Sequence, residues 1–200
     1  MAMYKPMSLM TIILASASPR RAELLQQLGL DFQTDSADID ETPLIEESVL
    51  DYVTRMAQTK NRLIREQYQP DSLVIGADTS VSIDEVIMGK PQDQSDFESM
   101  MTRLSGRTHC VHTAVSVSYL GKCLDAVSIS EVSFRALVMD EIRDYWHTGE
   151  PLDKAGGYAI QGLAAKFIQH LSGSYSGVMG LPLFELSELI QCLSSGDKNE

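Results

Sequence analysis

The sequence predicts an α/β protein, with a mixed twisted sheet flanked by helices and a cleft. In the first half of the chain, short apolar runs typical of buried strands alternate with segments of helical period. In the middle, two long strand-like runs, residues 108–119 and 122–134, are joined at Gly121 as in an antiparallel pair. A chain that combines the two patterns favours a mixed sheet with helices packed around it.

The first strand and helix are the clearest of the predicted elements. Residues 11–15 form an apolar run typical of a buried strand. The run from Leu9 to Ala15 resembles the apolar part of a secretory signal but is minimal for one, so we interpret the segment as a first strand. Ser18 and Pro19 then supply a hydroxyl N-cap and a proline for the first helical position. Gly29 stands where glycine commonly ends a helix. These features together predict a strand–helix unit at residues 11–29.

Turn residues and periodicity place the other elements. Ser95 and Glu98 have the spacing of a capping box, which predicts the start of a helix. Asp84 and Glu85 predict the turn of a hairpin. The remaining expectations are strands at residues 30–34, 72–79 and 166–170, and helices at residues 48–67, 95–104, 140–147 and 182–193.

Length and charge limit the classes of function. Two hundred residues fit one domain, and we expect a single α/β domain at residues 11–193, which can form two lobes around a cleft, between an N-terminal extension (1–10) and a frayed tail (194–200). A net charge of −12 argues against a nucleic-acid or anionic-membrane surface. Any anion site must therefore gather its few basic residues in one pocket. Three cysteines without a C-x-x-C pair suit a reducing cytoplasm.

The stretch "ASASPRR" has the residue types of an anion site. The hydroxyls of Ser16 and Ser18 precede a helix N-terminus, and Arg20 and Arg21 follow it. Free N–H groups, the positive end of the helix dipole and guanidinium groups together bind phosphate well. The alternative is an ordinary capped helix with two surface arginines. Spacing alone leaves both interpretations open.

One lysine of the long predicted helix lies on its apolar stripe. Lys60 is four residues after Met56 and three before Leu63, and both belong to the buried stripe. A buried amine needs an anionic partner, or else its chain extends past the edge of the core to solvent. Because it restores an uninterrupted apolar face, Lys60→Met should preserve the fold and can stabilise it, but it should lose triphosphate binding.

Further charged residues are predicted to lie at the same sheet edge. Asp78 ends the apolar run "VIGADT", and ligands of open α/β sheets bind at the carboxyl ends of strands. Glu41 and Lys90 stand in loops, and carboxylates beside phosphate-binding cations suit a hard divalent metal ion. Gln161, in the glycine-rich "DKAGGYAIQG", offers an amide that can pair with a base edge.

Eight motifs together resemble those of the Maf family. They are "LASASPRR", "DIDE", the lysine of "AQTKNR", "VIGADT", "GKP", "LSGRTH", "DKAGGYAIQG" and "GSYSGVMGLP", and they occur in the family's order over residues 11–190. The resemblance implies a fold similar to that of inosine triphosphate pyrophosphatases. It also implies a nucleoside triphosphate pyrophosphatase that uses a divalent metal (Mg²⁺, Mn²⁺ or Co²⁺) and forms a homodimer.

Within the family, Arg20, Thr79 and Gln161 match the branch that hydrolyses dTTP and UTP. The resemblance implies that Asp78 is the base that activates water and that Glu41 and Asp78 hold the metal. The residues implied to bind or select the substrate are Ser16, Arg20, Arg21, Lys60, Thr79, Lys90 and Gln161. Ala22 and Ala159 depart from the common family pattern, which puts affinity rather than chemistry in doubt.

Two other functions remain open at this point. The sister branch acts on 7-methyl-GTP, and it carries different residues at the three branch positions. A non-catalytic nucleotide-binding regulator of cell division, a septum formation inhibitor, would not require Asp78. Inosine triphosphate pyrophosphatases have motifs that the sequence lacks.

Overall fold

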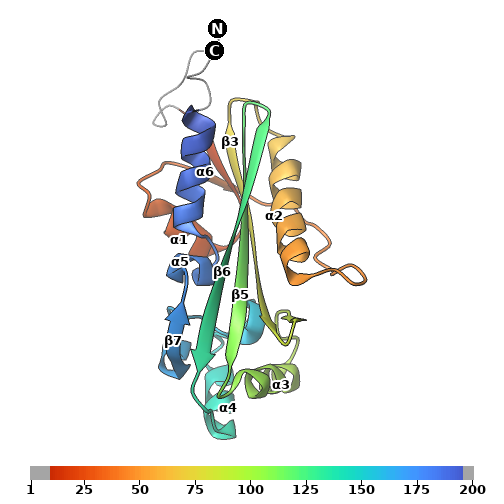
Figure 1. The fold of residues 1–200 in the computed structure, drawn as a ribbon, viewed down its shortest axis with the longest axis vertical. Helices are drawn as coiled ribbons and strands as arrows, with labels where there is room; N and C mark the ends of the chain where they lie inside the picture. Colours follow the sequence, from red (N-terminus) through yellow and green to blue (C-terminus); the bar gives the residue numbers. More distant parts are fainter. Residues whose placement is uncertain (1–9, 196–200) are drawn as a thin grey trace.

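A computed structural model describes residues 10–195 of the chain, and its mixed sheet flanked by helices confirms the predicted fold class (Figure 1). The elements in chain order are β1 (Ile12–Ala15), α1 (Pro19–Gln26), β2 (Gln33–Asp35), α2 (Val49–Arg65), β3 (Leu73–Ile83), β4 (Val86–Met88), α3 (Gln94–Leu104), β5 (Thr108–Tyr119), β6 (Lys122–Phe134), α4 (Met139–His147), η2 (Ala155–Gly157), η3 (Leu163–Phe167), β7 (Ile168–Ser172), α5 (Tyr175–Met179) and α6 (Leu183–Ser195).

The sheet has the strand order β2-β1-β3-β5-β6-β7, and β4 pairs with β3 beside this path. The pairs β1–β2 and β1–β3 are parallel, and all other pairs are antiparallel. Strands β5 and β6 run along most of the length of the molecule (Figure 1). The predicted long antiparallel pair is therefore confirmed, and it lies between β3 and β7 in the sheet.

Helices cover both faces of the sheet. Helix α2 packs on one face of β3 and β5, through apolar residues such as Val53 and Met56. Helices α1 and α6 pack on the opposite face, where Leu24, Leu25 and Ile190 join the core. Helices α3 and α4 enclose a second core at the far end of the long strands (Figure 1). Side chains of β3 alternate between the two faces, as the two-residue period of a strand requires.

Strand β3 has an unpaired stretch on one edge. Strand β1 pairs with it as far as Ile75, and β4 pairs with it from Val81 onward. Between these two neighbours, no strand of the described chain pairs with residues 76–80 on that edge. Asp78 was predicted to end its strand, and the structure corrects this: Asp78 lies in mid-strand because the hairpin with β4 and the ladder with β5 extend β3 to Ile83.

Several element boundaries also differ from the predictions. Asp93 rather than Ser95 caps α3, because its carboxylate accepts a hydrogen bond from the N–H of Asp96. Ser18 occupies the predicted N-cap position of α1, but its side chain makes no capping hydrogen bond. The second strand is β2 at Gln33–Asp35 instead of residues 30–34, and the strand expected at 166–170 is β7, which follows the helical turn η3.

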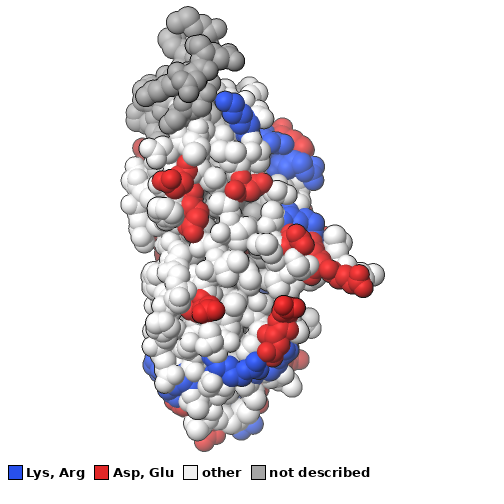
Figure 2. All heavy atoms as spheres, viewed as in Figure 1, with Lys and Arg blue, Asp and Glu red and all other residues white. Residues whose placement is uncertain are grey.

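The proposed terminal segments fall mostly outside the described residues. Residues 1–9 of the expected extension and 196–200 of the expected tail are not described, whereas Met10 is buried in the core and residues 194 and 195 belong to α6. Among residues 10–195, no helix is both long and apolar enough to cross a membrane. On the face in Figure 2, acidic side chains are dispersed between two groups of basic ones.

Candidate active site

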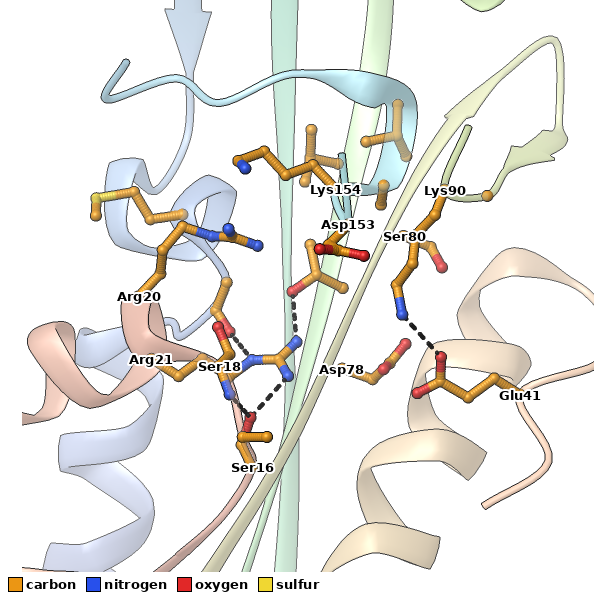
Figure 3. Close-up of a pocket in the computed structure, with 18 of the residues that line it drawn as sticks. Ser16, Ser18, Arg20, Arg21, Glu41, Asp78, Ser80, Lys90, Asp153 and Lys154 are labelled. Carbon is orange, nitrogen blue, oxygen red and sulfur yellow. Dashed lines mark hydrogen bonds and ion pairs between the residues drawn. The ribbon is translucent and has the colours of Figure 1, made fainter. Parts of the chain in front are cut away.

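A cavity of about 890 Å³ opens onto the unpaired edge of β3 (Figure 3). Because this edge is open, Asp78 on one face of the sheet and Thr79 on the other line the same cavity. Every residue singled out in the sequence as a site residue lines it, namely Ser16, Arg20, Arg21, Glu41, Lys60, Asp78, Thr79, Lys90 and Gln161. The parallel pairing of β1 and β3 brings the end of β1 beside Asp78, as the sequence predicted.

The guanidinium of Arg21 is held by three acceptors. Its Nε donates to the carbonyl of Gly180 at 2.7 Å, Nη1 to Ser16 Oγ at 3.3 Å, and Nη2 to Thr79 Oγ1 at 3.2 Å (Figure 3). Burial lowers the pKa of Arg21, and the charge of Asp78 partly opposes this effect. An arginine has five N–H groups, so two remain for a ligand. Arg21 is therefore fixed in orientation before a ligand binds.

Lys60 bridges two carboxylates. Its Nζ donates to Asp78 Oδ1 at 2.6 Å and to Glu41 Oε1 at 2.7 Å, and only 12% of its side chain is exposed. The anionic partner that the apolar stripe demanded is thus present, and the lysine does not extend to solvent. Burial acts to raise the pKa of Glu41, but the hydrogen bonds and charges of Lys60 and Lys90 outweigh it, and the pKa is lowered.

Close packing of α2 against β3 sets the position of Lys60. A Cβ on Gly76 would lie against the carbonyl oxygen of Ala57 and 2.7 Å from the backbone nitrogen of Asn61, so only glycine lets the helix approach this closely. The Asn61 amide donates to the carbonyls of Val74 (2.7 Å) and Ser116 (2.9 Å). Sequence reasoning missed Asn61, although it lies four residues after Ala57 and three before Ile64 on the buried stripe, so the signal that singled out Lys60 could have found it.

The loop that carries Glu41 is attached to the start of α2. The hydroxyl of Tyr52 donates to the backbone carbonyl of Glu41 at 2.9 Å, and burial raises the pKa of Tyr52 to about 12. Arg55 donates to the Glu47 carboxylate and to the Thr42 carbonyl. These contacts keep the Glu41 carboxylate beside Lys60.

Three cations of the cavity have donors to spare. Arg20 donates no hydrogen bond within the described chain, Lys90 reaches only Glu41 at 3.2 Å, and Lys154 reaches only the carbonyl of Leu152 at 3.3 Å. Burial, and then the charge of Arg20, lower the pKa of Lys154. Figure 3 shows the charged ends of Arg20 and Lys154 on one side of the cavity and Lys90 on the other. Lys154 stands in the glycine-rich motif already noted, but it had not been assigned to the site.

The loop that carries Gln161 is held in position by hydrogen bonds to Glu150. This carboxylate accepts from the hydroxyl of Tyr145 at 2.7 Å and from the N–H of Leu163 at 3.0 Å. The N–H of Ala159 donates to the same tyrosine oxygen at 3.2 Å. Gln161 thus lies between two anchored residues, which holds its backbone at the cavity wall.

The acidic residues fit a metal ion that shares its ligands with a substrate. In the described part of the chain, no three His, Cys, Asp or Glu residues gather closely enough to hold a metal alone. Glu41 and Asp78, however, converge on one ammonium group, so the structure already places a positive charge between them. Mg²⁺ typically takes one or two carboxylates and completes its shell with water and substrate phosphates. The donor set meets that requirement.

Comparisons with known proteins point to one family. The family model described as Maf-like protein matches residues 11–193. A protein of Pseudoalteromonas translucida named dTTP/UTP pyrophosphatase is 49% identical, over 92% of this chain and 98% of its own. A protein of the same name from Vibrio parahaemolyticus is 46% identical, over 91% and 96% of the two chains.

A solved structure supports the fold alone. The Staphylococcus aureus Ham1 protein has a TM-score of 0.50 with 12% identity, over 94% of this chain and 100% of its own. The family match, in contrast, covers nearly the whole chain and every residue of the cavity named above. This protein belongs to the Maf-like protein family.

Proposed function

We propose that this protein is a nucleoside triphosphate pyrophosphatase that hydrolyses dTTP and UTP to the monophosphate and pyrophosphate. The observation that carries the proposal is the lysine-bridged pair Glu41–Asp78, which faces Arg20 and Arg21 across one cavity. The names of the relatives at 46–49% identity support the same reaction and substrates.

The charge of the cavity suits a triphosphate. Five basic side chains line it against four acidic ones, in a protein whose net charge is −12. Lys60 is occupied by its two carboxylates, so the donors available to phosphate oxygens are those of Arg20, Lys90 and Lys154 and the two remaining N–H groups of Arg21. Guanidinium groups bind phosphate through two parallel hydrogen bonds, which fix the orientation of the triphosphate in addition to attracting its negative charge.

Asp78 is our candidate for the general base. Lys60 bonds its Oδ1, which leaves Oδ2 for the proton of a water molecule. The water oxygen attacks the α-phosphorus. The bond between the α-phosphorus and the oxygen that bridges it to the β-phosphorus breaks, and pyrophosphate leaves. Arg20, Arg21 and Lys90 offset the charge that develops on the leaving group. A divalent cation held by Glu41 and Asp78 would polarise the phosphoryl oxygens when bound.

We base the substrate preference on Gln161, the residue that we expect to contact the pyrimidine ring of the nucleotide. Gln161 presents a donor and an acceptor, which suits the edge of a pyrimidine. The family resemblance also leads us to propose action in the cytoplasm as a homodimer, and the three free thiols suit a reducing compartment.

A panel of nucleotides with Mg²⁺, Mn²⁺ or Co²⁺, assayed for pyrophosphate, tests the function. We expect release from dTTP and UTP far faster than from ATP, GTP or 7-methyl-GTP. Asp78→Asn preserves size and most acceptors, so it should fold while losing at least the 10²–10⁴-fold of general-base catalysis. Release of single phosphate would contradict the reaction, preference for 7-methyl-GTP would contradict the substrate, and near-normal Asp78→Asn activity would contradict the base.

A further inference from the structure

Gln161 lies in a four-residue turn whose two ends are bound to the same pair of side chains. The N–H of Gly162 donates to the carbonyl of Ala159 at 3.1 Å, which closes the turn around Gln161 and the residue before it. The two side chains that hold the ends are those of Tyr145 and Glu150. Neither of them lines the cavity, whereas Gln161 does.

Together, Tyr145 and Glu150 form a clamp on this turn. At its first end, the N–H of Ala159 donates to the hydroxyl of Tyr145 at 3.2 Å, and that hydroxyl donates to Glu150 Oε1 at 2.7 Å. At its second end, the N–H groups of Leu163 and Ala164 donate to the Glu150 carboxylate at 3.0 and 3.4 Å. A backbone N–H can only donate and a carboxylate can only accept, so the direction of every bond in the clamp is fixed.

The clamp is in direct contact with the turn and is fixed to the core. A Cβ on Gly162 would lie against the Glu150 carboxylate, so the backbone of the turn touches this group. Tyr145 is 2% exposed, and its ring packs against those of Phe97 and Phe167, with centroids 6.0 and 5.4 Å away. Burial and the bond to Glu150 raise the pKa of Tyr145, so its hydroxyl keeps the proton that it donates.

The part of the loop that carries Lys154 is anchored by other contacts. The N–H of Gly156 donates to the carbonyl of Gly89 at 3.0 Å. The hydroxyl of Tyr158 is hydrogen-bonded to His109 Nε2 at 2.8 Å. These contacts do not involve the clamp, so loss of the clamp should displace the turn and leave Lys154 in place.

We propose that Tyr145 and Glu150 are positioning residues for the base of the nucleotide: the clamp fixes the cavity wall at Gln161, and the triphosphate binds independently of it. The proposal rests on the proposed function and extends it to two residues outside the cavity. A recognition group keeps its geometry only if a second layer of hydrogen bonds supports it. The clamp should therefore affect the binding of nucleotides but not that of inorganic tripolyphosphate, which has no base.

Two isosteric variants test the clamp. Tyr145→Phe removes the acceptor of the Ala159 N–H, and Glu150→Gln replaces one acceptor oxygen by an amine that faces other donors. We expect each variant to weaken calorimetric binding of the α,β-imido analogues of UTP and dTTP by about 2–12-fold, the value of one neutral hydrogen bond. The double variant should lose less than the product of the two losses, because both residues act on one turn.

Binding of tripolyphosphate should be unchanged in Tyr145→Phe. This variant is the one to compare, because it changes no charge. Glu150→Gln removes a negative charge that raises the pKa of Lys154, one of the cations available to phosphate oxygens.

Glu141→Gln is the matched control for a purely structural effect. The Glu141 carboxylate also accepts from a backbone N–H, that of Val138 at 3.3 Å, and from a side chain, that of Arg135. It holds the start of α4 instead of the turn. Glu141→Gln should therefore lower stability and leave the affinities for the nucleotide analogues and for tripolyphosphate unchanged.

Amide hydrogen exchange follows the turn without any ligand. Exchange at the N–H of Ala159 should accelerate in Tyr145→Phe, and exchange at the N–H of Leu163 should accelerate in Glu150→Gln. The N–H of Gly156, which is bound outside the clamp, should keep its wild-type rate in both variants. General unfolding would instead accelerate all three.

The outcomes separate this proposal from the proposed function. Equal losses of affinity for the UTP analogue and for tripolyphosphate in Tyr145→Phe would overturn the proposal, and so would wild-type affinity for the analogue in both variants. A selective loss in Glu141→Gln would overturn it as well. None of the binding assays needs turnover. A wild type that binds the analogue but releases no pyrophosphate would therefore contradict the proposed function, while the clamp variants would still decide the proposal.

Discussion

Replacing Lys60 by methionine tests whether its ammonium is part of the structure or only of the substrate site. The apolar stripe of α2 by itself predicts that Lys60→Met is harmless or stabilising, and the structure reverses that expectation. The change leaves Asp78, with a side chain only 10% exposed, without its cation. Glu41 is 39% exposed and can be rehydrated, so the loss there is smaller.

The magnitude follows from these exposures. Removing one member of a fully buried ion pair costs about 3–5 kcal/mol, and partial exposure here reduces this to about 2–4 kcal/mol at pH 7. For a domain of this size, that is a fall in melting temperature of roughly 5–15 °C. Urea and thermal unfolding at pH 7 and low salt measure it directly.

A double variant isolates the cause. Lys60→Met combined with Asp78→Asn removes both charges, so it should recover most of the stability that Lys60→Met alone loses. A Lys60→Met protein as stable as the wild type would refute the reasoning, because Asp78 would then not depend on the ammonium. If the double variant is as unstable as Lys60→Met alone, the loss of stability comes from poor packing of the methionine side chain and not from the unpaired charge of Asp78.

Two further predictions concern other parts of the molecule. Gly76→Ala places a methyl group against backbone atoms of α2, so it should destabilise the protein by about 1–3 kcal/mol and lower activity by displacing Lys60. Gly89→Ala is the matched control, because a Cβ there meets nothing within 4 Å. Equal effects of the two substitutions on stability and activity would contradict the argument that α2 approaches β3 closely at Gly76. Burial lowers the pKa of His109 to about 4, against a usual 6.5. The unfolded chain therefore binds more protons between these values, and folding stability should fall by up to about 3 kcal/mol as the pH drops from 6.5 to 4. His109→Gln should show a flatter unfolding profile over this range, and an identical profile would contradict the assignment.

Local patterns in the sequence were enough to predict most elements and to single out residues that line one cavity. The proline and serines before α1, the apolar stripe of α2 and the alternation of β5 and β6 each reflect contacts within a short stretch of chain. Lys60 was informative because a cation on an apolar stripe requires a partner. The partner itself could be identified only once the loop of Glu41 and mid-strand Asp78 were seen together.

What the sequence could not show depends on relations between distant segments. The open edge of β3 exists because β1 ends before Asp78 and β4 begins after it, and neither boundary is visible in β3 itself. The contact of Thr113 with Thr79 depends on the register of β5 against β3. The N-cap of α3 was placed two residues late because Asp93 and Ser95 both suit that position, and the competition is decided by backbone geometry.

The open edge of β3 makes the site sensitive to insertions and deletions in a way that substitutions do not reveal. Asp78 and Thr79 are chain neighbours that face opposite sides of the sheet, one toward Lys60 and the other toward Arg21. A slip of one residue would present Thr79 to the lysine and Ser80 to the arginine in one direction, or Ala77 to the lysine and Asp78 to the arginine in the other. The continuous ladder from Val74 to Ser82 against β5 opposes such a slip. An insertion or deletion within this part of β3 would therefore separate Asp78 and Thr79 from their partners, Lys60 and Arg21, even if every side chain of the cavity were retained.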